Sequence, residues 1–110
     1  MKKNNSQTNI RIEESKNRWI KRGFKVDLLT GVPGEAWQSK GHEADEVLIF
    51  LEGEADVFFQ GKTYYPSIGE EFIIPAKVPH TFKVKTFCRY YFLMGLGWEK
   101  GDVGKPLDLE

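Results

Sequence analysis

Apolar and polar residues alternate in short stretches from Gly23 onward, and glycine or proline separates the stretches. Residues 24–28 read Phe-Lys-Val-Asp-Leu, and further along His80, Phe82 and Val84 fall on one face of a similar stretch. A period of two is typical of half-buried β-strands. About eight such stretches, with turns roughly every eight to twelve residues, predict an all-β sandwich or small barrel.

The stretch from Val47 to Leu51 differs, because it is apolar at every position. A strand of this kind has to be covered on both faces. We expect a second sheet on one side, and a partner chain or an N-terminal strand on the other. Because no further covering element is evident within the 110 residues, we predict a homodimer. The stretch is far too short to cross a membrane as a helix.

The N-terminal part lacks the two-residue period. Residues 1–9 are polar, and we expect them to be disordered or arm-like. Ile10 to Arg22 is predicted to form a short helix, with Trp19 and Ile20 as its apolar anchors. The predicted organisation is therefore an N-terminal arm over residues 1–22, a barrel over residues 23–97 and a loose tail over residues 98–110.

The charge is zero overall but unevenly distributed. Residues 1–25 hold eight basic and two acidic residues, so the arm is basic and the rest of the chain is acidic. We expect the arm to lie on the acidic barrel or in solvent. Nucleic-acid binding through the arm ranks last, because no base-reading element is visible. No glycine-rich phosphate loop is present, so no nucleotide cofactor is expected.

The cysteine count and the N-terminus bear on the compartment. Cys88 is the single cysteine, so no intrachain disulfide can form. No apolar segment follows Met1, so no secretory signal is expected. A cytoplasmic location is the resulting expectation.

The candidate chemistry lies in two histidines and a glutamate. His42 and Glu46 are four residues apart before the apolar strand, and His80, the other histidine of the chain, follows the Pro-flanked stretch PAKVPH. Neutral imidazole and carboxylate are suitable ligands for iron, manganese, nickel or zinc. Two imidazoles and one carboxylate leave coordination positions open for a substrate or oxygen.

The spacing of these residues resembles the two motifs of the cupin superfamily, in particular its small single-domain members. His42, Glu46 and Gly53 match the first motif in the stretch EVLIFLEGEADV. Gly69, Pro75 and His80 match the second in GEEFIIPAKVPH. The resemblance covers residues 30–94. It implies a double-stranded β-helix, or jelly-roll barrel, with a ligand site inside the barrel mouth, and many cupins form dimers.

Three positions depart from the cupin pattern. Lys40 stands where the family has its first histidine, Lys77 where it has a glycine after the motif proline, and Val84 where it often has an asparagine. Cupins with the full set hold a divalent metal through three histidines and one glutamate. This chain offers His42, Glu46 and His80.

Lys40 keeps two functions open. If residues 40–42 are extended, Lys40 points to the same side as His42, where its ammonium would repel a metal ion or pair with Glu46. Lys40→His should then raise metal affinity. One hypothesis is a metal-dependent enzyme acting on a small polar metabolite by oxygenation, isomerisation or decarboxylation. The other is a metal-free module that binds an acidic or sugar-like ligand through Lys40.

Aromatic residues near the motifs are candidates for the pocket wall. Trp37 is the strongest, because it precedes the first motif near the expected pocket mouth. For each of them the alternative is packing in the core. The remaining candidates are Phe50, Phe72, Phe82 and Tyr91.

Overall fold

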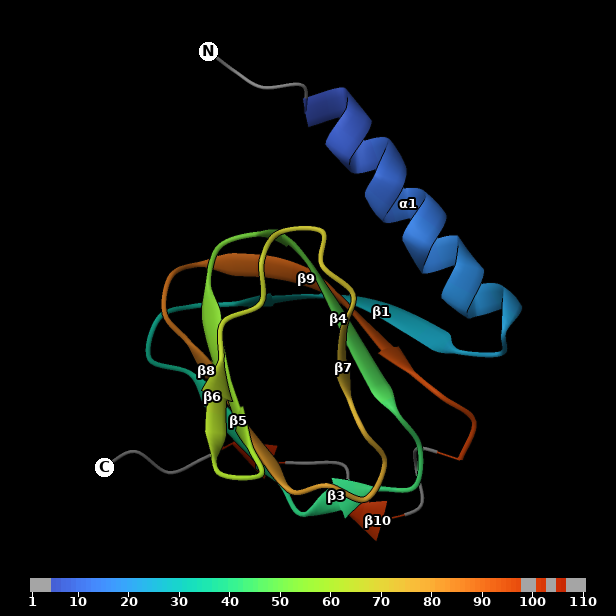
Figure 1. The fold of residues 1–110 in the computed structure, drawn as a ribbon. Helices are drawn as coiled ribbons and strands as arrows, with labels where there is room; N and C mark the ends of the chain where they lie inside the picture. Colours follow the sequence, from blue (N-terminus) through green and yellow to red (C-terminus); the bar gives the residue numbers. More distant parts are fainter. Residues whose placement is uncertain (1–4, 98–100, 103–104, 107–110) are drawn as a thin grey trace.

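Two antiparallel sheets face each other, and one helix of the described residues lies outside them (Figure 1). The computed structural model describes residues 5–97, 101–102 and 105–106. The first sheet has the order β1-β9-β4-β7. Its strands are β1 (Lys25–Gly31), β9 (Cys88–Met94), β4 (Glu46–Glu52) and β7 (Phe72–Ile74).

The second sheet has the order β11-β2-β8-β5-β6. Its strands are β11 (Lys105–Pro106), β2 (Ala36–Ser39), β8 (His80–Val84), β5 (Ala55–Phe59) and β6 (Lys62–Tyr64). A short pair, β3 (Gly41–His42) with β10 (Gly101–Asp102), lies beside them. This architecture confirms the predicted all-β jelly-roll barrel.

The main core fills the space between the two sheets. Strand alternation turns every second side chain inward, as the buried positions of β5 and β8 show. Phe50 and Phe72 belong to this core, with only 1% and 7% of their surfaces exposed. Each fully buried side chain of this size contributes about 1.5–3 kcal/mol. Phe50 and Phe72, predicted as candidates for the pocket wall, therefore take the alternative role of core packing.

Helix α1 (Asn5–Lys21) covers the outer face of the four-stranded sheet. Ile12 and Trp19 of the helix pack with Val47, Ile49 and Leu93. The two-faced strand is thus covered by the chain's own helix instead of a partner chain or an N-terminal strand. This arrangement removes the argument from which we predicted a homodimer.

The helix differs in detail from the prediction. It begins at Asn5, five residues before Ile10, so part of the segment expected to be disordered is helical. Ile20 is 39% exposed, and Ile12 is the second anchor beside Trp19. Ile12 and Trp19 are seven residues apart and therefore lie on the same helix face. Among the described residues, no helix is both long and apolar enough to cross a membrane.

Polar contacts fix the helix to the barrel. The Tyr91 hydroxyl donates to Glu13 Oε2 at 2.6 Å, and Lys16 Nζ donates to Glu13 Oε1 at 2.6 Å. Ser15 donates to the carboxylate of Glu71, next to β7. Arg18 pairs with the same carboxylate at 3.3 Å. Arg18 of the basic arm therefore contacts a carboxylate of the barrel, whereas Lys16 pairs with Glu13 within the helix. Successive residues of a strand point to opposite faces of the sheet. Tyr90 points into the barrel, so Tyr91 points outward to the helix.

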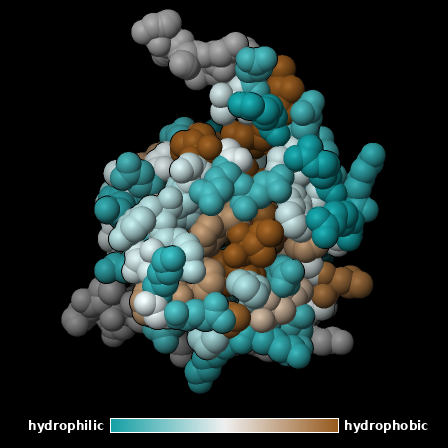
Figure 2. All heavy atoms as spheres, viewed as in Figure 1, coloured by the Kyte–Doolittle hydropathy of each residue, from teal (hydrophilic) through white to brown (hydrophobic). Residues whose placement is uncertain are grey.

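The visible face of the barrel is mostly hydrophilic (Figure 2). Hydrophobic residues gather near its centre, in the region where β7 passes β4 in Figure 1. Ile73 of β7 is 44% exposed. Of the predicted loose tail, β10 and β11 are described and pair with β3 and β2, while the remainder lies outside the described residues.

Gly53 provides a direct test of the barrel's packing. Its φ of +85° is left-handed, and a Cβ there would collide with the Phe87 carbonyl oxygen and lie 2.5 Å from Cys88 Cα. Gly61 has a similar φ of +78° but open space around it. Gly61→Ala should cost about 1–2 kcal/mol, from the left-handed backbone alone. Gly53→Ala should cost about 1–3 kcal/mol more, because the backbone must also move.

Urea unfolding of both variants measures this difference. Equal losses of unfolding free energy in the two variants would show that the close approach at Gly53 does not constrain the barrel.

Candidate metal centre

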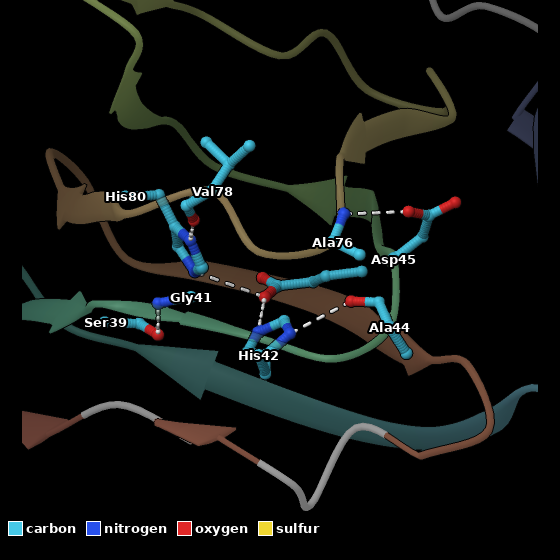
Figure 3. A network of polar contacts seen from close by, with 9 residues as sticks. Ser39, Gly41, His42, Ala44, Asp45, Ala76, Val78 and His80 are labelled. Carbon is cyan, nitrogen blue, oxygen red and sulfur yellow. Dashed lines mark hydrogen bonds and ion pairs between the residues drawn. The ribbon is translucent and has the colours of Figure 1, made fainter.

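Three strand ends bring the two histidines and the glutamate together. His42 ends β3, Glu46 begins β4 and His80 begins β8. His42 Nε2 lies 3.0 Å from Glu46 Oε1, and His80 Nε2 lies 3.3 Å from the same oxygen. Dashed lines from the labelled His42 and His80 rings mark these two contacts in Figure 3. Only 3% of His42, 5% of Glu46 and 9% of His80 is exposed.

Backbone carbonyls orient both imidazole rings. His42 Nδ1 lies 3.0 Å from the Ala44 oxygen, and His80 Nδ1 lies 2.9 Å from the Val78 oxygen (Figure 3). A carbonyl only accepts, so each Nδ1–H must donate. This assignment leaves Nε2 of each ring to face Glu46. Metal-binding histidines are commonly oriented by the same kind of second bond.

The separations of these atoms suit a metal ion. Ligand atoms about 2.1 Å from one ion are about 3–3.5 Å apart, and both histidine-to-glutamate distances fall in that range. The three donor atoms all lie within 4.8 Å of one another. The residues present therefore fit a divalent transition metal with open coordination positions.

The same contacts shift the ionisation of the site. The hydrogen bond to Glu46 raises the pKa of His42, although burial acts in the opposite direction. For Glu46 the largest single effect is burial, which would raise its pKa. The hydrogen bonds and charges of His42 and His80 together outweigh burial, so the pKa of Glu46 is lowered. A metal ion must displace protons from Nε2, so its binding should weaken as the pH falls through the raised pKa of His42.

A neighbouring loop stabilises the position of His42. The Lys77 N–H donates to the His42 carbonyl at 2.7 Å, and the Ala76 N–H donates to Asp45 Oδ1 at 2.8 Å. Lys77 has a φ of +67°, a conformation that glycine adopts more readily. This explains why the family pattern has a glycine at this position. Gly41 lies against the loop, since a Cβ there would be 2.8 Å from the Lys77 carbonyl carbon.

Lys40 does not take the position expected from an extended backbone. Gly41 has a φ of +110°, which breaks the alternation between residues 40 and 42. As a result Lys40 is exposed while His42 is buried. Glu46, the partner considered for Lys40, accepts from the two histidines.

A cavity of about 370 Å³ adjoins the three donors. Glu46 and His80 line it, and His42 lies behind them. Of the predicted wall residues, Trp37 and Phe82 line the cavity, and Lys40, Phe50, Phe72 and Tyr91 do not. The remaining lining residues are Leu29, Thr30, Glu35, Gln38, Ser39, Leu48, Tyr90 and Phe92.

Tyr90 and Phe92 line the cavity but were not among the predicted wall residues. The alternation in CRYYFLM could have indicated them, because both share the inward face of the strand with Cys88. For Glu35 the sequence offered no such signal. It stands in a turn between two strands, and only the packing of the sheets brings it to the cavity.

Solved structures of other proteins share this fold. A cupin superfamily protein from Desulfitobacterium hafniense superposes with a TM-score of 0.60 at 18% identity, covering 64% of this chain and 65% of that one. A cupin-2 domain protein from Shewanella frigidimarina gives 0.57 at 27% identity, covering 64% and 68%. Ectoine synthase from P. lautus gives 0.66 at 18% identity, covering 78% and 67%. The chain therefore has the cupin fold, as the two sequence motifs predicted.

One curated protein is also similar in sequence. The pyrimidine/purine nucleoside phosphorylase of Hydrogenovibrio crunogenus is 37% identical over 70 residues, covering 62% of this chain. The matched region spans 65% of the relative's length. No family model matches the chain.

The shared carboxylate can be tested by titration. In metal-free protein the pKa of His42 should lie above its ordinary value. Glu46→Gln should lower it, because the hydrogen bond and the negative charge are lost while burial stays. NMR of the imidazole nitrogens across pH measures both values, and with two histidines in the chain the spectra are simple.

Glu35→Gln is the matched control for this titration, because Glu35 lines the same cavity and is not one of the two groups bonded to the His42 ring. A His42 pKa that Glu46→Gln leaves unchanged would contradict the shared-carboxylate arrangement.

Proposed function

We propose that the protein is a metal-dependent enzyme acting on a small polar molecule bound in the barrel cavity. One observation carries the proposal: two buried imidazoles, each oriented by a backbone carbonyl, direct Nε2 at one carboxylate oxygen. Without a metal the two imidazoles compensate the buried carboxylate, and a bound cation would take over that role. The adjoining cavity has a volume within the usual range for small ligands.

The donor set favours one reaction class. Two histidines and one carboxylate with open positions are the ligand set of non-haem Fe(II) oxygenases. Bound iron would supply oxygen chemistry, whereas zinc would supply Lewis-acid chemistry for isomerisation or decarboxylation. We therefore rank oxygenation first. The exposed position of Lys40 removes the main objection to a metal, because its ammonium is not part of the cavity wall.

The chain's own residues have distinct roles in this proposal. His42, Glu46 and His80 would hold the ion. Phe82 and Phe92 form an apolar wall that limits water around the substrate. Burial, followed by the negative charge of neighbouring groups, raises the pKa of Tyr90. Its hydroxyl therefore stays protonated and can donate a hydrogen bond to the substrate.

A metal-free module for acidic ligands is less well supported. The described residues that line the cavity include Glu35 and Glu46 but no lysine or arginine. An anion placed there without a metal would face two carboxylates and no permanent cation. The binding-module alternative therefore needs a neutral or cationic ligand.

Metal loading tests the main proposal. Protein incubated with Fe²⁺, Mn²⁺, Ni²⁺ or Zn²⁺ and then desalted should retain about one ion per chain, measured by elemental analysis. His80→Ala should lower the affinity by about 100-fold or more, because one of three ligands is lost. Glu35→Gln is the matched control and should leave the stoichiometry unchanged, since Glu35 lines the cavity but is not one of the three donors.

Retention of none of the four ions would overturn the metal proposal, as would retention that His80→Ala leaves unchanged.

Lys40→His tests whether residue 40 points toward the metal ligands or lies outside the site. Because this side chain is exposed, the substitution should change metal affinity by less than about twofold. A large gain would place residue 40 within reach of the ion.

A second candidate function comes from the curated relative, which is named a pyrimidine/purine nucleoside phosphorylase. The apolar and aromatic cavity wall could accept a neutral base. Orthophosphate, however, is bound in proteins by arginine, lysine or backbone N–H groups. The described lining residues offer neither of these two side chains, so we rank this activity second.

An assay with uridine and adenosine distinguishes the two candidates. We expect no phosphate-dependent release of free base above that of a protein-free control, measured by chromatography. Phosphate-dependent release that persists in metal-free protein and in His80→Ala would replace the metal proposal with phosphorolysis.

A further inference from the structure

The cavity has a negatively charged group near each end. Glu46 belongs to the three-donor site, and Glu35 lies in the turn before β2. Ser39, at the other end of β2, pairs with His80, while the Glu35 carbonyl accepts from Val84 N–H. Four residues of extended strand correspond to about 13 Å. Glu35 is therefore a separate anionic point, well apart from the candidate metal ligands.

The Glu35 carboxylate is held in place without a neutralising partner. Its Oε1 accepts from the Val32 N–H at 3.0 Å, and the Glu35 N–H donates to the Val32 carbonyl at 3.1 Å, which closes the turn. Among the residues that the structure describes, no lysine, arginine or histidine forms an ion pair with it. Glu35 itself lines the cavity, and its negative charge is the last of the causes, after burial, Cys88 and Glu46, that raise the pKa of Tyr90.

The wall between the two carboxylates is aromatic. Trp37, Phe82, Tyr90 and Phe92 line it, and the faces of such rings attract organic cations. Tyr90 is only 7% exposed, and no partner for its hydroxyl is found within the described part of the chain. Because Tyr90 lines the cavity, its hydroxyl is available to form a hydrogen bond with a ligand.

We propose that the cavity selects an amine-bearing molecule, whose ammonium group pairs with Glu35 and whose apolar body lies between the aromatic walls toward the three donors. The inference rests on the proposed function only in taking this cavity as the substrate site. It names the substrate class: a small organic cation, in preference to a neutral molecule or an acid of the same shape.

Three probes of equal length test this selectivity. These are 3-phenylpropylamine, 3-phenylpropan-1-ol and 3-phenylpropanoate, titrated by calorimetry into full-length protein freed of metal with a chelator. The amine should bind about tenfold or more tightly than the acid, with the alcohol between them. Glu35 is exposed, so water screens its charge, and Glu35→Gln should weaken binding of the amine about threefold to fivefold. Binding of the alcohol should stay unchanged.

Glu70→Gln is a closely matched control. Glu70 closes its own turn through the same kind of bond, with Ser67 N–H donating to Oε1 at 2.8 Å, but it does not line the cavity. Its substitution should leave all three affinities unchanged. Comparison of the two variants therefore separates the charge in the cavity from the general effect of altering a turn.

Three results would each overturn the inference. These are an acid that binds as tightly as the amine, equal effects of Glu35→Gln and Glu70→Gln, and no binding of any probe at millimolar concentration. Because metal-free protein is used, the outcome is independent of metal loading. Stoichiometric metal without amine selectivity would overturn only this inference, and amine selectivity without metal would overturn only the metal proposal.

Discussion

The burial of the Glu46 carboxylate is the constraint on which the site depends. An ionised carboxylate is costly to remove from water unless hydrogen bonds or opposite charge compensate it. Here two imidazoles contact one of its oxygens. His42 comes from β3 of the short strand pair, and His80 comes from β8 of the five-stranded sheet. The ends of β3, β4 and β8 therefore have to meet at one place. The contact of Lys77 with His42 and the close approach at Gly41 maintain this meeting.

The two faces of the four-stranded sheet serve different purposes, and adjacent tyrosines illustrate this. Tyr90 points into the barrel and lines the cavity, while Tyr91 points outward and binds Glu13 of the helix. A strand turns successive side chains to opposite faces, so one residue step separates ligand binding from helix docking. The helix in turn buries Val47, Ile49 and Leu93, which would otherwise form an exposed apolar surface.

The cupin fold alone does not specify what this protein does, because one fold can host many chemistries. Function has to be argued from the cavity. Three features distinguish it: a shared carboxylate between two oriented imidazoles, an aromatic wall, and a second carboxylate held by the turn before β2. The first suits a metal ion, and the last two suit a small organic cation. The absence of lysine and arginine from the described lining residues makes both features consistent with one electronegative cavity.

The sequence by itself determined the fold class and the three donors. The two-residue period predicted the strands, and the spacing of His42, Glu46 and His80 within the two motifs selected the residues that meet. Both are local signals, written in consecutive residues. The tertiary structure decided the roles of Lys40, of the helix and of Glu35. The left-handed backbone at Gly41 turns Lys40 outward, Ile12 and Trp19 find their partners across some thirty or more residues of chain, and Glu35 meets the cavity only when two sheets pack. Contacts between distant segments leave no periodic pattern in a single sequence, and for this physical reason only the folded structure could show them.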